Sequence, residues 1–372
     1  MKQKLIFADD GYEQFLEYLK SLGARRALLV HGSSMLKLEV GQFLLNLPQQ
    51  IGVDIVEFTD FAPNPAIESV LKGASLCREK QCDMIIACGG GSAMDVAKCI
   101  RLFVEVDMGR EDFLSDLKSG RLPLIAIPTT AGTGSEATHF AVIYKDGKKL
   151  SIAEKGNIPQ AVLLDEKVLA GLPLRQKKAT FFDALCHAIE SCWSVNATEE
   201  SRTYAKETIR ILIASEPRYL SEECTMADNM AMLLAAHYAG KAINISKTTA
   251  GHAMCYKLTS KFGLPHGQAA LLCLVELWPY MLEKARADKG LEGNFQEIAE
   301  AMGENSSLEA AGKLRELAAK HGMLKPLCPE ADDTLIAELT GSVNVERLQN
   351  HPLKLSEADF QELYRRILKG NN

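Results

Sequence analysis

The sequence predicts an α/β dinucleotide-binding domain of the Rossmann-like type, with a mainly parallel sheet, followed by an all-α domain. In the first half, short apolar runs rich in β-branched residues alternate with amphipathic stretches of helical period, which is typical of βαβ units. In the second half, long helical patterns follow one another almost without such runs. The chain has 372 residues, a length that exceeds what a single hydrophobic core usually supports, so two domains are expected.

The elements can be placed in order along the chain. Strands are expected at 24–32, 53–58, 83–91, 122–130 and 161–165. Helices are expected at 65–80, 92–106, 200–214, 225–243 and 268–284. Gly147 and its neighbours favour a turn, and a hairpin is expected around it. Gly171 and Pro173 interrupt the pattern, which predicts domains at 1–172 and 173–372.

Composition excludes several classes of partner. The net charge is −6 and basic residues are scattered among acidic ones, so no nucleic-acid surface is expected. No apolar run reaches the roughly 18 residues that span a bilayer, and the first residues lack the features of a signal peptide. The ten cysteines have no CxxC spacing and are expected to be reduced. We therefore expect a cytoplasmic protein with no membrane partner.

Two loops have the composition of a dinucleotide site. In the first, which we call the glycine loop (89–92), Gly89, Gly90 and Gly91 end an expected strand and let backbone N–H groups at a helix start approach a pyrophosphate. Ser92 is expected to be the N-cap, with Asp95 completing a capping box. A plain tight turn is the alternative, although it seldom needs three glycines.

The second, which we call the threonine loop (128–136), contains Thr129, Thr130 and Thr133 at the end of the next expected strand. Open α/β sheets bind ligands at such strand ends. A Ser/Thr-rich turn that caps a helix is the alternative. The two loops together favour a dinucleotide.

Four residues of the second half suit a metal. Asp183 and His187 are four residues apart on an expected helix, so both side chains can reach one point. Such a pair alone is more often structural, because a buried carboxylate satisfies a histidine well. His252 follows in a helical pattern and His266 in a turn before the next helix. Three imidazoles and a carboxylate suit Fe²⁺ or Zn²⁺ and leave room for a substrate oxygen.

In the motifs GGGSAMDVAK, PTTAGTGSE, DALCHAIE and GHAMCYKLTSKFGLPHG, the chain resembles the iron-containing (group III) alcohol dehydrogenase family over essentially its whole length. The resemblance implies that family's dehydroquinate synthase-like fold. It implies Asp183, His187, His252 and His266 as metal ligands, with iron favoured over zinc. It also implies NAD(P)H along the glycine and threonine loops, and hydride transfer to a carbonyl carbon that the metal polarises.

Two positions depart from the family pattern. Many members carry a further histidine, implicated in proton relay, where this chain has Tyr256, on the helical face of His252. Its hydroxyl could line the site, or the ring could simply pack. After the first expected strand, where NAD-selective members often place an aspartate, this chain has Gly32 and Ser33. That loop permits NADPH without excluding NADH.

The segments SCWSVNATEESR and NISKTTAGHAMCYKLTS resemble the branch of the family that reduces phosphonoacetaldehyde to 2-hydroxyethylphosphonate. Lys247, among Ser246, Thr248 and Thr249, offers the charge and hydroxyls that a phosphonate needs, and Arg202 is a second candidate. Both residues could instead lie on solvated surface. If Lys247 recognises the phosphonate, changing it to alanine or methionine should raise KM for phosphonoacetaldehyde far more than for an uncharged aldehyde.

The leading interpretation is therefore a phosphonoacetaldehyde reductase. A dehydrogenase of short uncharged alcohols or diols, such as 1,2-propanediol or butanol, is the alternative with the same chemistry. A non-catalytic dinucleotide-binding assembly protein is the alternative of another class, and four intact ligands argue against it. A homodimer or higher homo-oligomer is expected, since dimers are the commonest assembly and the family has precedents.

Overall fold

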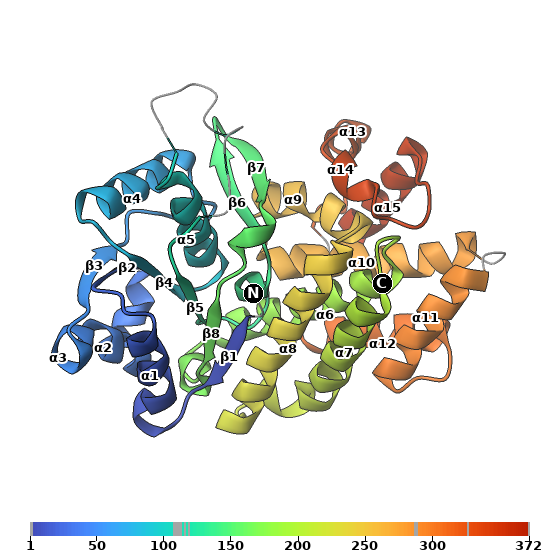
Figure 1. Cartoon of the computed structure of the whole chain (residues 1–372). Coiled ribbons are helices and arrows are strands. Elements are labelled where there is room, and N and C mark those ends of the chain that lie inside the picture. The colour runs from blue at the N-terminus through green and yellow to red at the C-terminus, as the bar shows by residue number, and fades with distance from the viewer. Residues whose placement is uncertain are drawn as a thin grey trace. The chain divides into compact units, whose positions relative to one another are not determined.

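The protein forms two compact units, one with a sheet and one that is helical (Figure 1). The computed structural model describes residues 3–106, 114, 117, 120–285, 289–325 and 327–370. The first unit comprises Met1–Leu172 and Cys224–His237, and the second comprises Pro173–Glu223 and Tyr238–Asn372. The predicted fold class, a parallel α/β unit followed by helices, is confirmed.

The sheet of the first unit has six strands, all parallel, in the order β1-β8-β5-β4-β2-β3. The strands are β1 (Lys4–Phe7), β2 (Arg26–His31), β3 (Asp54–Phe58), β4 (Met84–Gly89), β5 (Leu124–Pro128) and β8 (Ala161–Leu164). Strands β4 and β5 are buried at every position, which suits their continuous apolar runs. The sequence did not predict β1, because its four residues include a single buried one.

The helices of the first unit follow the strands and a separate hairpin. They are α1 (Glu13–Ser21), α2 (Glu39–Leu45), α3 (Leu47–Ile51), α4 (Ile67–Glu79) and α5 (Gly91–Phe103). The predicted hairpin is confirmed as β6 (Phe140–Lys145) and β7 (Lys148–Ala153), with Lys145 opposite Lys148. The turn residues Asp146 and Gly147 have φ of 52° and 71°, the left-handed conformation that two-residue hairpins favour.

The second unit is built from helices. They are α6 (Leu174–Trp193), α7 (Glu199–Tyr219), α9 (Ala250–Phe262), α10 (His266–Lys284), α11 (Lys289–Met302), α12 (Ser307–Lys320), α13 (Asp333–Gly341), α14 (Val345–Leu348) and α15 (Glu357–Lys369), with the end of α8 (Met226–Ser246). Helix α6 packs against α7, α10 and α11 and is buried at every residue from Ala179 to Trp193. A helix buried on all sides has no solvated face, so its polar residues need partners inside the protein.

The first half of α8 belongs to the sheet unit. Asn229 donates a hydrogen bond to the backbone oxygen of Glu166 (3.1 Å). Further along α8, the buried His237 lies 3.5 Å from the carboxylate of Glu136 in the threonine loop. Through these polar contacts, residues 224–237 belong to the unit that contains the sheet, although this segment follows two long helices in the chain.

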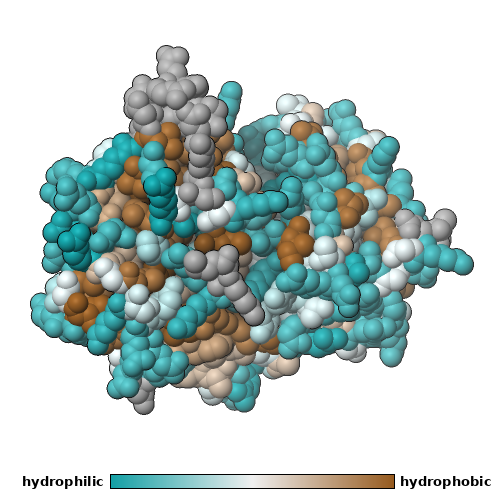
Figure 2. All heavy atoms as spheres, viewed as in Figure 1, coloured by the Kyte–Doolittle hydropathy of each residue, from teal (hydrophilic) through white to brown (hydrophobic). Residues whose placement is uncertain are grey.

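The surface is mixed in character. On the face shown in Figure 2, hydrophobic side chains occur in small groups among hydrophilic ones. Within the described part of the chain, no helix combines the length and the apolar character that a membrane span requires.

Candidate metal centre

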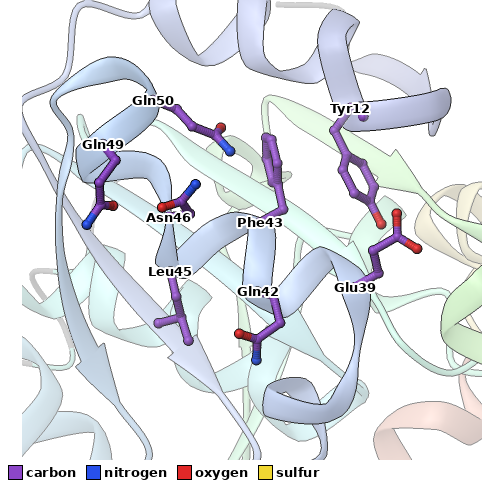
Figure 3. Close-up of a pocket in the computed structure, with 9 residues that line it drawn as sticks. Tyr12, Glu39, Gln42, Phe43, Leu45, Asn46, Gln49 and Gln50 are labelled. Carbon is purple, nitrogen blue, oxygen red and sulfur yellow. The ribbon is translucent and has the colours of Figure 1, made fainter.

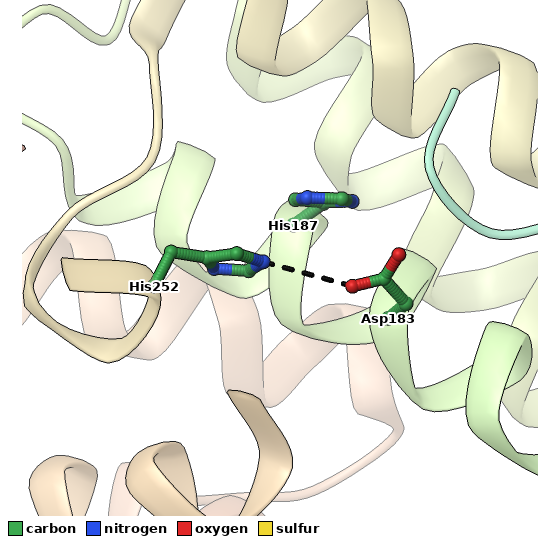
Figure 4. Close-up of side chains that lie close together, drawn as sticks. All are labelled: Asp183, His187 and His252. Carbon is green, nitrogen blue, oxygen red and sulfur yellow. Dashed lines mark ion pairs between the residues drawn. The ribbon is translucent and has the colours of Figure 1, made fainter. Parts of the chain in front are cut away.

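Three of the predicted ligands form one buried cluster (Figure 4). Asp183 and His187 lie one turn apart on α6, and His252 comes from α9. Their candidate ligand atoms all lie within 4.8 Å of one another. Oδ1 of Asp183 is 3.7 Å from Nε2 of His252, and the rings of His187 and His252 stack with centroids 4.4 Å apart. Ligands about 2.0–2.2 Å from one metal lie at most about 4.4 Å apart, so one ion can contact both Asp183 and His252.

The fourth predicted ligand, His266, reaches the same carboxylate. His266 is the first residue of α10, and its Nε2 lies 3.8 Å from Oδ1 of Asp183. Its ring centroid is 5.4 Å from that of His252. The His266 side chain is 37% exposed, whereas Asp183 and His252 are buried. The structure therefore brings all four predicted ligands together, with His266 at the side open to solvent.

The cluster contains buried polar atoms that make no hydrogen bond with the rest of the described chain. These atoms are Oδ1 of Asp183, Nδ1 of His187 and Nε2 of His252. Buried polar atoms are nearly always satisfied, so three exceptions in one cluster need an explanation. A divalent cation accepts lone pairs from a carboxylate and from imidazoles, and it fits this donor set.

The protonation states of Asp183 and His187 also suit a cation. Burial raises the pKa of Asp183, but the charges of His187, His266 and His252 outweigh burial and hold that pKa below its usual range. Burial lowers the pKa of His187 to about 4, against the opposing charge of Asp183. At neutral pH the cluster therefore offers an ionised carboxylate and a neutral His187, which are the forms that bind metals.

Glu190, which the sequence reading missed, supports the cluster from α6. One oxygen of its buried carboxylate accepts a hydrogen bond from Nδ1 of His252. The other accepts from the hydroxyl of Thr249 (2.6 Å) and the backbone N–H groups of Thr249 (3.1 Å) and Gly251 (2.9 Å). Burial raises the pKa of Glu190, but the charge and hydrogen bond of His252 outweigh it and lower that pKa to about 2. An acceptor on Nδ1 fixes the ring and leaves Nε2 for a metal.

A close approach of two helices explains the glycine that follows His266. A Cβ atom at Gly267 would lie 2.0 Å from the backbone oxygen of Ala179 and 2.7 Å from Cβ of Asp183. Only glycine allows the first turn of α10 to lie this close to α6. This contact brings His266 to Asp183.

The residues proposed for proton relay and substrate binding lie in different surroundings. Tyr256 stacks on His266, with centroids 5.8 Å apart and an interplanar angle of 17°. Its role in proton relay stays a prediction. Lys247 is exposed and has a left-handed φ of 61° just after α8. Arg202 is 3.8 Å from the carboxylate of Glu297 in α11, so its nearest acidic partner is a residue outside the metal cluster.

The glycine and threonine loops meet at the carboxyl edge of the sheet. Strands β4 and β5 are neighbours, and the N–H of Thr129 donates to the oxygen of Gly89 (3.0 Å). A Cβ at Gly90 would lie 3.2 Å from Oγ1 of Thr130, and one at Gly91 would lie 3.2 Å from Cγ2 of Thr133. The two glycines therefore leave room for the threonine loop.

The predicted capping box at Ser92 is wrong. Helix α5 begins at Gly91, and its N-cap is Gly90 in an extended conformation, so Ser92 already lies inside the first turn. Asp95 instead accepts a hydrogen bond from the hydroxyl of Ser135 (3.0 Å). Burial raises the pKa of Asp95 to about 6, opposed by the charge of Lys98. Asp95 therefore ties α5 to the threonine loop.

A carboxylate lies beside the loop at Gly32 and Ser33. His31 ends β2, and its Nε2 is 3.0 Å from the carboxylate of Glu57 in the neighbouring strand β3. Glu57 is 48% exposed. Residues 30–34 contain no carboxylate of their own, and the parallel sheet supplies one from the adjacent strand β3.

The first unit also has a surface pocket of about 610 Å³ (Figure 3). Aromatic residues Tyr12 and Phe43 line it, together with Glu39 and side-chain amides. The Tyr12 hydroxyl donates to Asp165 (2.7 Å). The lining residues are not among those predicted for the metal, the cofactor or the substrate, so this pocket is separate from the candidate site.

Comparisons with known proteins agree with this geometry. A family model described as iron-containing alcohol dehydrogenase matches residues 2–166, and its C-terminal counterpart matches residues 177–368. The chain is 30% identical to 1,3-propanediol dehydrogenase of Citrobacter freundii, over 96% of this chain and 88% of that protein. It is 33% identical to phosphonoacetaldehyde reductase of Streptomyces viridochromogenes, over 57% of each chain.

Among solved structures, the fold is similar to that of sulfoacetaldehyde reductase from Bifidobacterium kashiwanohense in complex with NAD+. The TM-score is 0.87 and the sequence identity is 27%, over 98% of this chain and 97% of that one. The likeness therefore extends over both units of the chain.

Proposed function

The chain belongs to the iron-containing alcohol dehydrogenase family, and on that premise we propose that it reduces phosphonoacetaldehyde to 2-hydroxyethylphosphonate with NAD(P)H. The observation that carries the catalytic part is the cluster of buried carboxylate and imidazole atoms that find no hydrogen-bond partner among the described residues. The relative named phosphonoacetaldehyde reductase supports the substrate. The relatives named 1,3-propanediol dehydrogenase support a second candidate, the oxidation of short uncharged alcohols or diols.

The proposed ligands are Asp183, His187, His252 and His266. An iron or zinc ion held there supplies Lewis-acid polarisation of a carbonyl oxygen. Glu190 accepts a hydrogen bond from Nδ1–H of His252, so that Nε2 presents its lone pair. At the sheet edge, the start of α5 offers backbone N–H groups to the cofactor pyrophosphate. These residues would bind and orient the reactants, and a reduced nicotinamide held there would supply the hydride for the carbonyl carbon.

Oxidation of NADH and NADPH by the metal-reconstituted enzyme tests the proposal, with phosphonoacetaldehyde, lactaldehyde and propanal as substrates. We expect a higher kcat/KM for phosphonoacetaldehyde, and loss of activity on chelation that Fe²⁺ or Zn²⁺ restores. Equal or better turnover of the uncharged aldehydes would favour the second candidate. Light scattering on the same preparation tests the proposed homo-oligomer.

We expect Glu57 to set the choice of cofactor. A carboxylate beside the Gly32 loop can accept a hydrogen bond from the ribose 2′-hydroxyl of NADH, and it repels the 2′-phosphate of NADPH. Glu57→Gln should therefore lower the ratio of kcat/KM for NADH over NADPH by about tenfold, the size of one charge-assisted hydrogen bond. Asp54→Asn, at the other end of β3, is the matched control. An unchanged ratio in Glu57→Gln would refute this role.

A further inference from the structure

Arg347 of α14 is a part-buried cation without a carboxylate partner in the described part of the chain. Its guanidinium lies 5.4 Å from the ring centroid of Tyr256 and donates a hydrogen bond to the hydroxyl of Thr248. A guanidinium has five N–H donors, and charges withdrawn from water are normally paired. The remaining donors and the unbalanced charge point to an anionic ligand.

One shared ring links Arg347 to the metal centre. The Tyr256 ring that contacts the guanidinium also stacks on His266, one of the proposed metal ligands. The guanidinium is therefore one aromatic ring away from a proposed ligand.

Hydrogen bonds fix α14 in this place. Asn344 caps the helix by accepting from the N–H of Arg347 (3.0 Å), and its own N–H donates to the backbone of α9 (3.3 Å). Asn350, just beyond α14, donates to the oxygen of Thr248 (3.1 Å) and accepts from the side chain of Asn196 (2.8 Å). The network therefore joins Arg347 to both segments that resemble the phosphonoacetaldehyde-reducing branch, 191–202 and 244–260.

We infer that Arg347 binds the anionic group of the substrate, a phosphonate or a sulfonate, while the aldehyde end of the same molecule faces the metal cluster. The inference rests on the proposed function. In phosphonoacetaldehyde the phosphorus atom is two bonds from the carbonyl carbon, so the cation must lie near the metal ligands. Arg347 meets this requirement through Tyr256, whose ring stacks on His266. A planar guanidinium can donate two parallel hydrogen bonds to two oxygens of such a group.

The two cations expected from the sequence fit this role less well. Lys247 is exposed, so a contact with it would be weakened by water. Arg202 has the carboxylate of Glu297 beside it, and Lys206 contacts the same carboxylate (2.9 Å). Of the three cations, Arg347 alone combines partial burial with contacts to the metal-site residue Tyr256.

The experiment compares Arg347→Met, Arg347→Lys and, as a matched control, Lys247→Met in the metal-loaded enzyme. Kinetics are measured with phosphonoacetaldehyde, sulfoacetaldehyde and propanal, and binding of methylphosphonate and methanesulfonate is measured by calorimetry. We expect Arg347→Met to raise KM for the charged aldehyde about 10- to 100-fold, the range of one or two charge-assisted hydrogen bonds. The Kd of methylphosphonate should rise in parallel, and kinetics with propanal should change little.

Each outcome decides the inference. Equal affinity of wild type and Arg347→Met for both anions overturns it, as does a loss confined to Lys247→Met. Arg347→Lys keeps the positive charge but loses the planar guanidinium that donates two parallel hydrogen bonds. Unchanged anion affinity of Arg347→Lys would therefore contradict paired hydrogen bonds, even if Arg347→Met failed to fold. A higher kcat/KM of the wild-type enzyme for propanal would contradict the proposed function. Anion binding that depends on Arg347 would still support the inference. The anion with the lower Kd, methylphosphonate or methanesulfonate, identifies the group that the site binds.

Discussion

Changing Glu190 to alanine is expected to destabilise the metal-free protein by about 3–5 kcal/mol, the usual result of breaking a buried charged pair, and to weaken metal binding about 10- to 100-fold. The substitution leaves the N–H of His252 and the donors of Thr249 and Gly251 buried without an acceptor. Thermal or urea denaturation gives the stability, and competition with a chelator gives the metal affinity.

The pKa of Glu190 gives the sign of its pH dependence. The pKa is lowered from 4.5 in the ordinary group to about 2 in the folded protein. The contribution of Glu190 is therefore fully present above pH 4.5 and is lost as the pH falls towards 2. The variant Glu190→Gln should lack this pH-dependent contribution to stability, although its amide oxygen can still accept a hydrogen bond from Thr249.

Glu207→Ala is the control for this prediction. Glu207 is an exposed residue of α7 whose nearest cation, Arg210, is 3.6 Å away on the same helix, so we expect a loss of at most about 0.5 kcal/mol. If Glu190→Ala were as stable as Glu207→Ala and bound metal as tightly as wild type, the supporting role of Glu190 would have to be abandoned.

Gly267→Ala is expected to lower stability by about 1–3 kcal/mol, the usual cost of overpacking, and to reduce metal affinity and kcat/KM more than tenfold. The new methyl group would overlap the backbone of α6 at Ala179 and the Cβ of Asp183, so α10 must move away from α6. Because His266 precedes Gly267, this movement takes His266 away from Asp183. Melting temperature, metal content and kinetics measure the three effects.

Gly312→Ala provides a matched control for the helix-propensity part of that change. Gly312 lies inside α12, and a Cβ there would meet no described atom beyond its own helix backbone within 4 Å. Alanine should therefore stabilise this helix by about 0.5–1 kcal/mol. A Gly267→Ala variant that was also stabilised, with its metal affinity intact, would show that the contact between α6 and α10 does not position His266.

Local patterns were sufficient to predict much of the architecture. The buried strands β4 and β5 stand out because both of their faces are apolar, and the i, i+4 spacing of Asp183 and His187 shows that they share a helical face. The error at Ser92 arose because serine is a strong N-cap, while Gly90, two residues earlier, already adopts the N-cap conformation. The strand order, in contrast, depends on contacts that no local pattern contains.

The residues that the sequence reading missed take their meaning from distant partners. Nothing in the local sequence of its largely apolar helix distinguishes Glu190 from a structural acidic residue. Its partner His252 is 62 residues away. Arg347 lies 99 residues from Thr248, in a helix of four residues with no strong pattern. Glu57 is opposite Leu29 in the parallel pair β2–β3, and only this pairing brings its carboxylate to the side chain of His31. Such residues become visible once the tertiary contacts are known.

The proposed ligand set has a consequence for metal supply in the cell. Three imidazoles and one carboxylate favour no single first-row ion by geometry, and intrinsic affinity for such a site rises from manganese through iron to copper, with zinc above iron. An enzyme that needs ferrous iron at Asp183, His187, His252 and His266 would therefore be exposed to mismetallation, and the ion it carries would follow the local abundance of each metal during synthesis and purification.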